Sequence, residues 1–194
     1  KRYNKNEQNK NLDENDEDED GNIIQIEHKE GDEFNGIMQY LTNKTGGNIH
    51  DNGTVDISSR STLGNRPPKN LVDYNESNFY HSKHHDPNVC VCFDFKERRV
   101  KLSSYSIKSY SNAPFRYHLK NWNIEASNDG SNWTIIDEHK NDFSLNGNSI
   151  IVTFNIQKET KFYRFIRIHQ TGTNTSNDYC MLFYSLEFYG KIKE

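Results

Sequence analysis

The feature that most constrains the fold of this chain is a series of eight short runs rich in β-branched and aromatic residues. Asn, Asp, Gly, Ser and Pro separate these runs, which is the pattern of strands joined by turns. Only one segment shows a helical pattern. The sequence therefore predicts an all-β sandwich or barrel of about eight strands with one short N-terminal helix. The eight runs are residues 55–59, 89–95, 100–110, 119–127, 132–139, 149–156, 161–170 and 181–190.

The helical pattern follows residue 35. Asn35 is a residue type that caps the N-terminus of a helix, and Gly46 with Gly47 is expected to end it. Between these limits the apolar residues recur at helical spacing. They are Ile37, Met38, Tyr40 and Leu41.

The clearest local signal is a hairpin over residues 122–135. Its turn is Asn128-Asp129-Gly130, residues that tolerate the left-handed backbone of a tight turn. The two tryptophans could stack on a ligand, but burial of so large a side chain favours a place in the core. The alternating apolar residues are Trp122, Ile124 and Ala126 before the turn, and Trp133 and Ile135 after it.

Residues 161–170 are apolar at both odd and even positions, which predicts a strand that is buried on both faces. Arg164 and Arg167 lie within this run. A buried guanidinium group needs a partner, so we expect each to bind a carboxylate or loop carbonyl groups.

The acidic residues are concentrated at the start of the chain. Residues 1–35 hold 5 Lys and Arg against 12 Asp and Glu, a net charge of −7, whereas the remaining residues carry a net charge of +3. We expect residues 1–33 to form an acidic flexible tail or linker and residues 34–194 to form the folded domain. The tail is interpreted as a solubilising spacer or as an attractant for a basic partner. A net charge of +3 without a dense basic stripe argues against nucleic acid as a partner.

The chain contains three cysteines, Cys90, Cys92 and Cys180, and no run of about 18 apolar residues. An odd count without a paired framework argues against a disulfide scaffold and favours a reducing, cytoplasmic location. Because the sequence begins at Lys1, we expect it to be a piece of a longer protein. This leaves the compartment open, since a removed signal peptide would reverse the location.

The order of the strands and turns resembles the discoidin family, also known as the coagulation factor five/eight type C domain. The resemblance covers residues 50–190 and rests on three segments: SNDGSNW in the hairpin, FYRFIRI in the seventh run and LEFYG at the end. It implies an antiparallel jelly-roll sandwich of the galactose-binding type. It also implies recognition rather than catalysis, through loops at one end that bind sugars, lipid head groups or proteins.

Several departures from the family pattern qualify this resemblance. No cysteine lies near residues 50 or 190 to form the end-to-end disulfide of secreted members. Residues 60–70 form a short loop with Leu63 as its one large apolar residue, so membrane insertion is not expected. The positions that help to hold a structural calcium in sugar-binding relatives are Asp73, Asn78 and Glu187, but Tyr74 replaces the glycine of the intervening turn. We therefore expect no metal and no cofactor.

The segment YHSKHHDPNVCVC at residues 80–92 concentrates histidines and cysteines. A zinc site would combine Cys90 and Cys92 with two histidines, but thiols two residues apart on a strand point in parallel rather than toward one ion. Catalysis would need a thiol exposed beside a base, and a buried strand provides neither. We interpret both cysteines as buried structural residues.

The remaining interpretation of this loop is a binding surface. Cationic, titratable and aromatic side chains are expected to meet at one end of the sandwich, where they could bind a glycan or a protein. Histidines would make such binding sensitive to pH between roughly 5.5 and 7.5. Ordinary solvated loop residues remain the alternative. The candidate binding residues are Arg66, His81, Lys83, His84, His85, Arg116, Tyr117 and His118.

Two functions are compatible with the sequence. The first is a non-catalytic, lectin-like module that binds a glycan or a protein surface. The second is an intracellular interaction domain that serves as an adaptor in a larger multidomain protein. The isolated domain is expected to be a monomer in either case.

Overall fold

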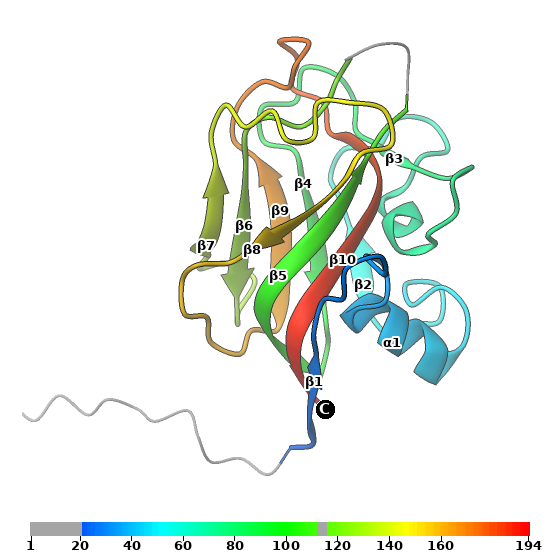
Figure 1. The fold of residues 1–194 in the computed structure, drawn as a ribbon, viewed down its shortest axis with the longest axis vertical. Coiled ribbons are helices and arrows are strands. Elements are labelled where there is room, and N and C mark those ends of the chain that lie inside the picture. Colours follow the sequence, from blue (N-terminus) through cyan, green and yellow to red (C-terminus); the bar gives the residue numbers. More distant parts are fainter. Residues whose placement is uncertain (1–20, 112–115) are drawn as a thin grey trace, which may run out of the picture.

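The computed structural model describes residues 21–111 and 116–194, so the expected tail before residue 21 lies outside the described residues. Ten strands form two five-stranded antiparallel sheets that pack face to face (Figure 1). The first sheet has the order β1-β10-β5-β8, with β3 also paired to β10. The second has the order β2-β4-β9-β6-β7. The predicted all-β sandwich is confirmed.

The first sheet contains β1 (Ile23–Ile26), β3 (Tyr80–His81), β5 (Arg99–Ser109), β8 (Ile151–Asn155) and β10 (Leu182–Lys193). The second contains β2 (Asp56–Ser58), β4 (Cys90–Asp94), β6 (Trp122–Ser127), β7 (Thr134–His139) and β9 (Phe165–Gln170). Helix α1 (Ile37–Thr45) and the short 3₁₀ helix η1 (Pro68–Val72) lie beside the sheets. The two strands not predicted, β1 and β3, have only four and two residues. No helix in the described part of the chain has the length and apolarity to cross a bilayer.

Aromatic side chains from both sheets fill the space between them. Trp122 of β6 is fully buried, and its indole N–H donates to the Tyr105 hydroxyl of β5 at 3.0 Å. Its ring also lies edge-on to Phe154 of β8, with 5.3 Å between ring centroids. Farther along, Phe93 of β4 meets Phe188 of β10 at 5.2 Å. Trp122 is therefore a core residue, as predicted.

The predicted hairpin between β6 and β7 is confirmed, but its second strand differs from the expected alternation. The pairing register shifts opposite Ile124 and Glu125, so Ile136 is an extra residue in β7. This bulge turns Ile136 into the core and leaves Ile135 40% exposed. Trp133 is half-buried on the outer face, where the Arg167 guanidinium lies 4.0 Å from its ring centroid.

Strand β9 is buried on one face only, so the prediction of burial on both faces is wrong. Ile166 and Ile168 point into the sandwich, whereas the alternate residues are half-exposed on the outer face of the sheet. The apolar character of Phe165 on this outer face has a local cause, since it packs against the Trp133 ring at 6.4 Å.

Both arginines near β9 bind carboxylates, as predicted. The Arg164 guanidinium donates two hydrogen bonds to Asp94, at 2.7 and 2.9 Å. The Arg167 guanidinium donates to the Glu125 carboxylate at 2.5 Å. Paired hydrogen bonds of this kind combine charge with fixed geometry, which suits a structural role.

Residues 21–33 correct the expected domain boundary. β1 pairs with the C-terminal half of β10 in the register Ile23↔Lys193 to Ile26↔Gly190, so the linker prediction is wrong for this part of the chain. Ile24 and Ile26 pack against the core, while Ile23 and Gln25 face solvent. Four residues in a strongly charged sequence carry too weak a strand signal, and the free edge of β10 supplies the hydrogen bonds that order them.

Helix α1 ends at Gly46 as predicted, but its N-terminus is not capped by Asn35. The Asn35 side chain bonds Asp32 instead. The cap is the buried Glu187 carboxylate of β10, which accepts the backbone N–H groups of Gly36, Met38 and Gln39 at 2.9–3.0 Å. A carboxylate satisfies the unpaired N–H groups of a helix N-terminus and complements its dipole.

The first prediction concerns this cap. Changing Glu187 to Gln replaces an acceptor oxygen by an amide that cannot accept these N–H groups, so we expect the free energy of unfolding to fall by about 2–3 kcal/mol. The Tyr74 hydroxyl donates to the same carboxylate at 2.7 Å, and Tyr74→Phe removes that single bond and should cost about 1 kcal/mol. Urea denaturation measures both. An E187Q protein as stable as the native chain would refute the assignment.

The second prediction concerns β1. Removing residues 1–33 exposes the edge of β10 and the apolar groups that Ile24 and Ile26 cover, so the melting temperature should fall. Removing only residues 1–20 should leave it unchanged. Thermal unfolding of the two truncated chains beside the full chain is the comparison. Equal melting temperatures for all three would show that β1 adds no stability.

Candidate functional site

Three connecting segments meet at the end of the sandwich that is uppermost in Figure 1: residues 82–89, 116–121 and 171–181. Backbone hydrogen bonds join them, from Asp86 N–H to the Tyr179 carbonyl at 3.1 Å and from Thr175 N–H to the His118 carbonyl at 3.0 Å. The side chains that they bring together form what we call the histidine rim. Its members are His81, His84, His85, Tyr117 and Asp178.

Asp178 organises the histidine rim. It is 9% exposed, and one carboxylate oxygen lies 2.5 Å from His84 Nδ1. The other accepts the His85 backbone N–H at 3.1 Å and lies 3.2 Å from His85 Nδ1. Burial opposes ionisation of Asp178, but the bonds from His84 and His85 outweigh it and lower the pKa of the carboxyl. The ionised carboxylate therefore fixes the orientation of the His84 ring.

His81 lies deeper than the other two histidines. Its ring is half-buried and meets His84 edge-on, with 5.2 Å between centroids. Burial lowers the pKa of His81, and the neighbouring His84 and Arg66 lower it further. His81 Nε2 is buried and has no hydrogen-bond partner among the described residues. A neutral imidazole with an unused nitrogen can accept a hydrogen bond or a metal ion.

Aromatic rings surround the histidines. Tyr117 lies edge-on to His84 at 5.4 Å. Arg66 is half-buried, and its guanidinium stacks 4.1 Å from the Phe79 ring centroid. Phe79 in turn packs on Tyr110 at 4.4 Å, so Arg66 is held beside the histidine rim by an aromatic cluster.

The other candidate binding residues differ in position. Lys83 and Arg116 are exposed next to the histidine rim. His118 is a correction, because its side chain is 1% exposed and its Nε2 lies 3.1 Å from the Tyr110 carbonyl oxygen. A buried ring bonded to the backbone cannot contact a ligand at the surface. Sequence reasoning missed Asp178, because its partners precede it by 94 and 93 residues.

The positions considered for calcium do not fit that ion. Glu187 is fully buried and its oxygens are occupied by the helix N-terminus and the Tyr74 hydroxyl. Tyr74 adopts a φ of 49°, so it keeps the left-handed turn of the glycine it replaces. Asp73 bonds the side chains of Asn48 and Asn78. The helix dipole and the hydrogen bonds stabilise the Glu187 carboxylate, which is what a bound cation would do in the relatives that hold calcium.

Cys90 and Cys92 share one face of β4 as predicted, but this is the half-buried outer face and not the core. The alternate residues, Val91 and Phe93, fill the core instead. Burial raises the pKa of Cys90, and it raises the pKa of Cys92 to about 12. Both groups are therefore protonated, weakly nucleophilic thiols near neutral pH.

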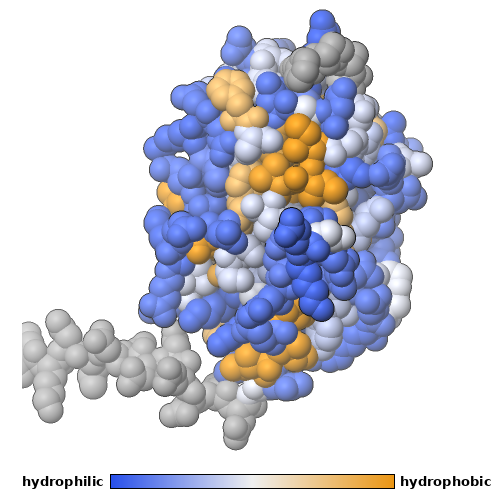
Figure 2. Space-filling model, viewed as in Figure 1, coloured by the Kyte–Doolittle hydropathy of each residue, from blue (hydrophilic) through white to orange (hydrophobic). Residues whose placement is uncertain are grey.

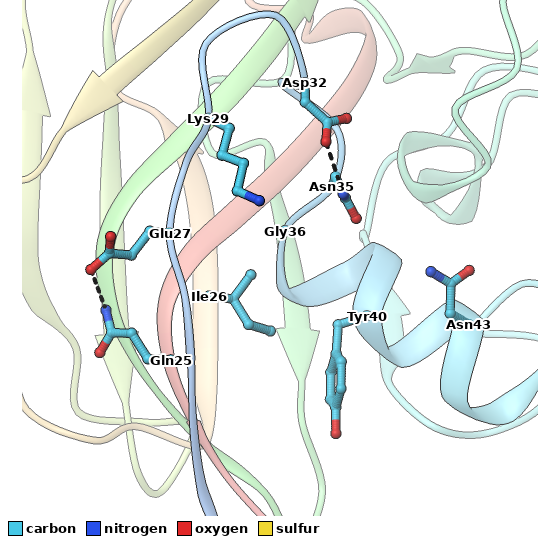
Figure 3. A pocket seen from close by; sticks show the side chains of 9 residues that line it. All are labelled: Gln25, Ile26, Glu27, Lys29, Asp32, Asn35, Gly36, Tyr40 and Asn43. Atoms are coloured by element: carbon cyan, nitrogen blue, oxygen red, sulfur yellow. Dashed lines mark hydrogen bonds between the residues drawn. The ribbon is translucent and has the colours of Figure 1, made fainter.

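A pocket of about 320 Å³ lies away from the histidine rim, between β1 and α1 (Figure 3). Figure 3 shows side chains from the strand, the following loop and the helix around it, among them Ile26, Lys29 and Tyr40. Because residues 21–33 were expected to form a linker, this pocket was not predicted from the sequence. Its lining combines charged and amide side chains with Ile26 and Tyr40, and none of the nine lining residues is a histidine or a cysteine.

Exposed apolar side chains lie on several parts of the molecule, and one of them, Leu63, borders the histidine rim, because its N–H donates to the His81 carbonyl at 2.8 Å. Figure 2 shows a largely hydrophilic face with separate hydrophobic patches. No member of the histidine rim is among the exposed large hydrophobic residues of the described chain, so polar and aromatic contacts characterise this surface. These hydrophobic residues are Ile23, Leu63, Ile135, Phe143, Ile150 and Ile151.

Comparison with known families gives a match over most of the folded region. The sequence model of the F5/8 type C domain matches residues 54–183. This range includes all eight candidate binding residues, nine of the twelve strands and helices of the described chain (β2, η1 and β3 to β9), and the start of β10.

Two curated relatives are much longer than this chain. The E3 ubiquitin-protein ligase hecd-1 of Caenorhabditis elegans is 26% identical over 184 residues, which is 89% of this chain and 7% of that protein. The E3 ubiquitin-protein ligase Ufd4 of Drosophila melanogaster is 38% identical over 81 residues, which is 40% of this chain and 3% of that protein.

Solved structures with this fold include carbohydrate-binding modules. CpGH89CBM32-5 from Clostridium perfringens, in complex with GalNAc-beta-1,3-galactose, aligns with a TM-score of 0.58 at 12% identity over 71% of this chain and 96% of that chain. The family 32 module of C. perfringens NanJ, in complex with galactose, aligns with a TM-score of 0.56 at 18% identity over 71% and 94% of the two chains. At these identities the likeness establishes the fold.

The third prediction concerns the thiols of β4. Because burial raises the pKa of Cys90 and Cys92, their reaction with Ellman's reagent should be slow at pH 7.5 and should accelerate through pH 9 without levelling off. The same chain unfolded in urea should react faster at pH 7.5, since free cysteine has a pKa of about 8.5. A rate that reaches a plateau below pH 8 would contradict the raised pKa values.

Proposed function

Because the chain belongs to the F5/8 type C domain family, we propose that it is a non-catalytic recognition module that binds a glycan or a protein surface through the histidine rim. The observation that carries the proposal is the cluster built on the buried Asp178 carboxylate, which holds His84 and His85, while the rings of His81 and Tyr117 pack on His84. The two sheets provide a rigid support for loops that carry binding groups.

The histidine rim has the two chemical properties that recognition of a sugar requires. Imidazole and phenol groups donate and accept hydrogen bonds to hydroxyl groups, and Tyr117 offers a ring that can cover the apolar face of a sugar. Arg66, Lys83 and Arg116 beside it add cationic donors for an acidic sugar or a carboxylate. The similar fold of modules solved with bound galactose supports a glycan as the first candidate.

A second candidate is a protein ligand within a larger multidomain chain. The match to hecd-1 over 89% of this chain favours it, because that protein is named as an E3 ubiquitin-protein ligase. In a protein of that kind, the module would select or position a protein partner. Tyr and Arg side chains, which the histidine rim and its border supply, are common anchors of protein interfaces.

The proposal includes no catalytic step. Cys180 lies near His84 and Asp178, an order of groups that also occurs in cysteine hydrolases. However, Cys180 is fully buried, and burial raises its pKa to about 12. A buried and protonated thiol cannot attack a substrate.

The fourth prediction tests recognition with a broad glycan array and, in parallel, a pull-down of protein ligands by the full chain. Changing His85, Arg116 and Tyr117 together to Ala should weaken specific binding at least about tenfold, since loss of interface anchors costs more than about 1.4 kcal/mol. These three side chains lie at the surface, so the fold should persist and circular dichroism should be unchanged.

Lys29→Ala with Asn43→Ala provides the matched control, because both residues line the pocket between β1 and α1. This double variant should bind as the native chain does. Binding that survives the triple variant but is lost in the control would place recognition at the pocket and overturn the role of the histidine rim. Silence on the array together with a specific protein ligand would favour the second candidate.

A further inference from the structure

We propose that His81, His84 and Cys180 bind one Zn²⁺ ion at the floor of the histidine rim. One ligand atom from each of these residues lies within 4.8 Å of the other two, the arrangement in the described chain that brings His and Cys ligands together. Two imidazole nitrogens and a thiolate sulfur are the donors that zinc prefers. Cys90 and Cys92 do not belong to this cluster.

The backbone explains why these residues meet although the sequence separates them by almost 100 positions. β3 pairs with β10 so that His81 lies opposite Leu182, two residues after Cys180. The Ser82 N–H donates to the Met181 carbonyl at 3.0 Å, and the Met181 N–H donates to the Ser82 hydroxyl at 2.8 Å. His81 and Cys180 are therefore fixed by strand pairing rather than by mobile loops.

A second observation, separate from the spacing of the three side chains, also indicates a bound ligand at His81. Its Nε2 is buried and finds no hydrogen-bond partner among the described residues, which is costly for a polar atom. Binding a metal ion would satisfy it.

His84 already has the outer partner that a metal-binding histidine usually has. Asp178 Oδ2 lies 2.5 Å from His84 Nδ1, and a carboxylate at this distance accepts the proton that Nδ1 carries. The other nitrogen, Nε2, is then the one that can bind zinc. A carboxylate in this position fixes the ring and increases the basicity of the ligand nitrogen.

Cys180 completes the set. It is fully buried, and the Asn174 side-chain amide donates to its sulfur at 3.3 Å. Burial raises the pKa of Cys180 to about 12, so the metal-free protein holds a thiol. Zn²⁺ displaces this proton to solvent as the Zn–S bond forms, and the thiolate that results keeps the hydrogen bond from Asn174.

The spacing is compatible with a tetrahedral ion after a small adjustment. Zinc bonds of about 2.1 Å to nitrogen and 2.3 Å to sulfur place ligand atoms roughly 3.5 Å apart. A small backbone shift of the exposed residues 83–85, which carry His84, can close the remaining distance. Three protein ligands leave a fourth position for water on the solvent side.

The fifth prediction is that the metal-free full chain binds one Zn²⁺ and that Zn²⁺ raises its melting temperature. Titration calorimetry gives the stoichiometry. Replacing zinc by Co²⁺ should produce a thiolate-to-metal charge-transfer band, which carboxylates in the acidic N-terminal region cannot produce. Cys180→Ser and His81→Ala should each abolish the band and weaken Zn²⁺ binding at least about 100-fold, and Asp178→Asn should weaken it about 10–100-fold.

The matched control is the double variant Cys90→Ser with Cys92→Ser, which removes the other thiols. It should bind Zn²⁺ as the native chain does. If Cys180→Ser does not fold, His84→Gln on the exposed segment gives the same test. Binding unchanged in Cys180→Ser and His84→Gln, binding lost in the Cys90/Cys92 variant, or no charge-transfer band would each overturn the site. Zinc binding is measured without glycan or protein ligand, so its outcome is independent of the recognition proposal.

Discussion

One hydrogen-bonded network joins the two sheets and fixes how they pack against each other, and the loops of the candidate site start from strands that it holds. The Trp122 indole donates to the Tyr105 hydroxyl, which donates to Asp137 at 2.7 Å. His139 bonds the same carboxylate at 2.9 Å and stacks flat on Trp122, with 4.2 Å between centroids. Each of the four polar side chains in this network has a partner within it, so the network fixes how the two sheets pack without the cost of unpaired groups. Trp122 is also the first residue of β6, so this network anchors the segment that carries Tyr117.

The strands were predictable wherever burial on one face left an alternating pattern, as in β4. The alternating pattern of one strand does not show which other strand it pairs with. β3 has two residues and exists because β10 offers it an edge, and β1 follows the same logic at the other end of β10. The bulge at Ile136 was not predicted for a related reason, because the pairing register of β7 depends on its partner strand β6 and not on the composition of β7 alone.

The exposed residues of the candidate site were predictable from the sequence, whereas the buried residues beneath them were not. His84, His85 and Tyr117 could be identified because polar and aromatic residues in turns usually reach solvent. Asp178 and Cys180 carry no such signal, since a single acid or thiol in a polar segment has many ordinary explanations. Their importance comes from contacts with residues more than 90 positions earlier. His118 shows the converse error, in which a titratable residue in a loop is used to satisfy a backbone carbonyl.

The pairing of β1 with the end of β10 places the beginning and the end of the folded domain side by side, with Ile23 opposite Lys193. Both lie at the end of the sandwich opposite the histidine rim (Figure 1). A longer polypeptide could therefore carry this domain as an insertion, leaving and rejoining its own path at one point. The domain would then be attached to the host chain at one end only, and its recognition loops would lie at the opposite end, directed away from the host chain.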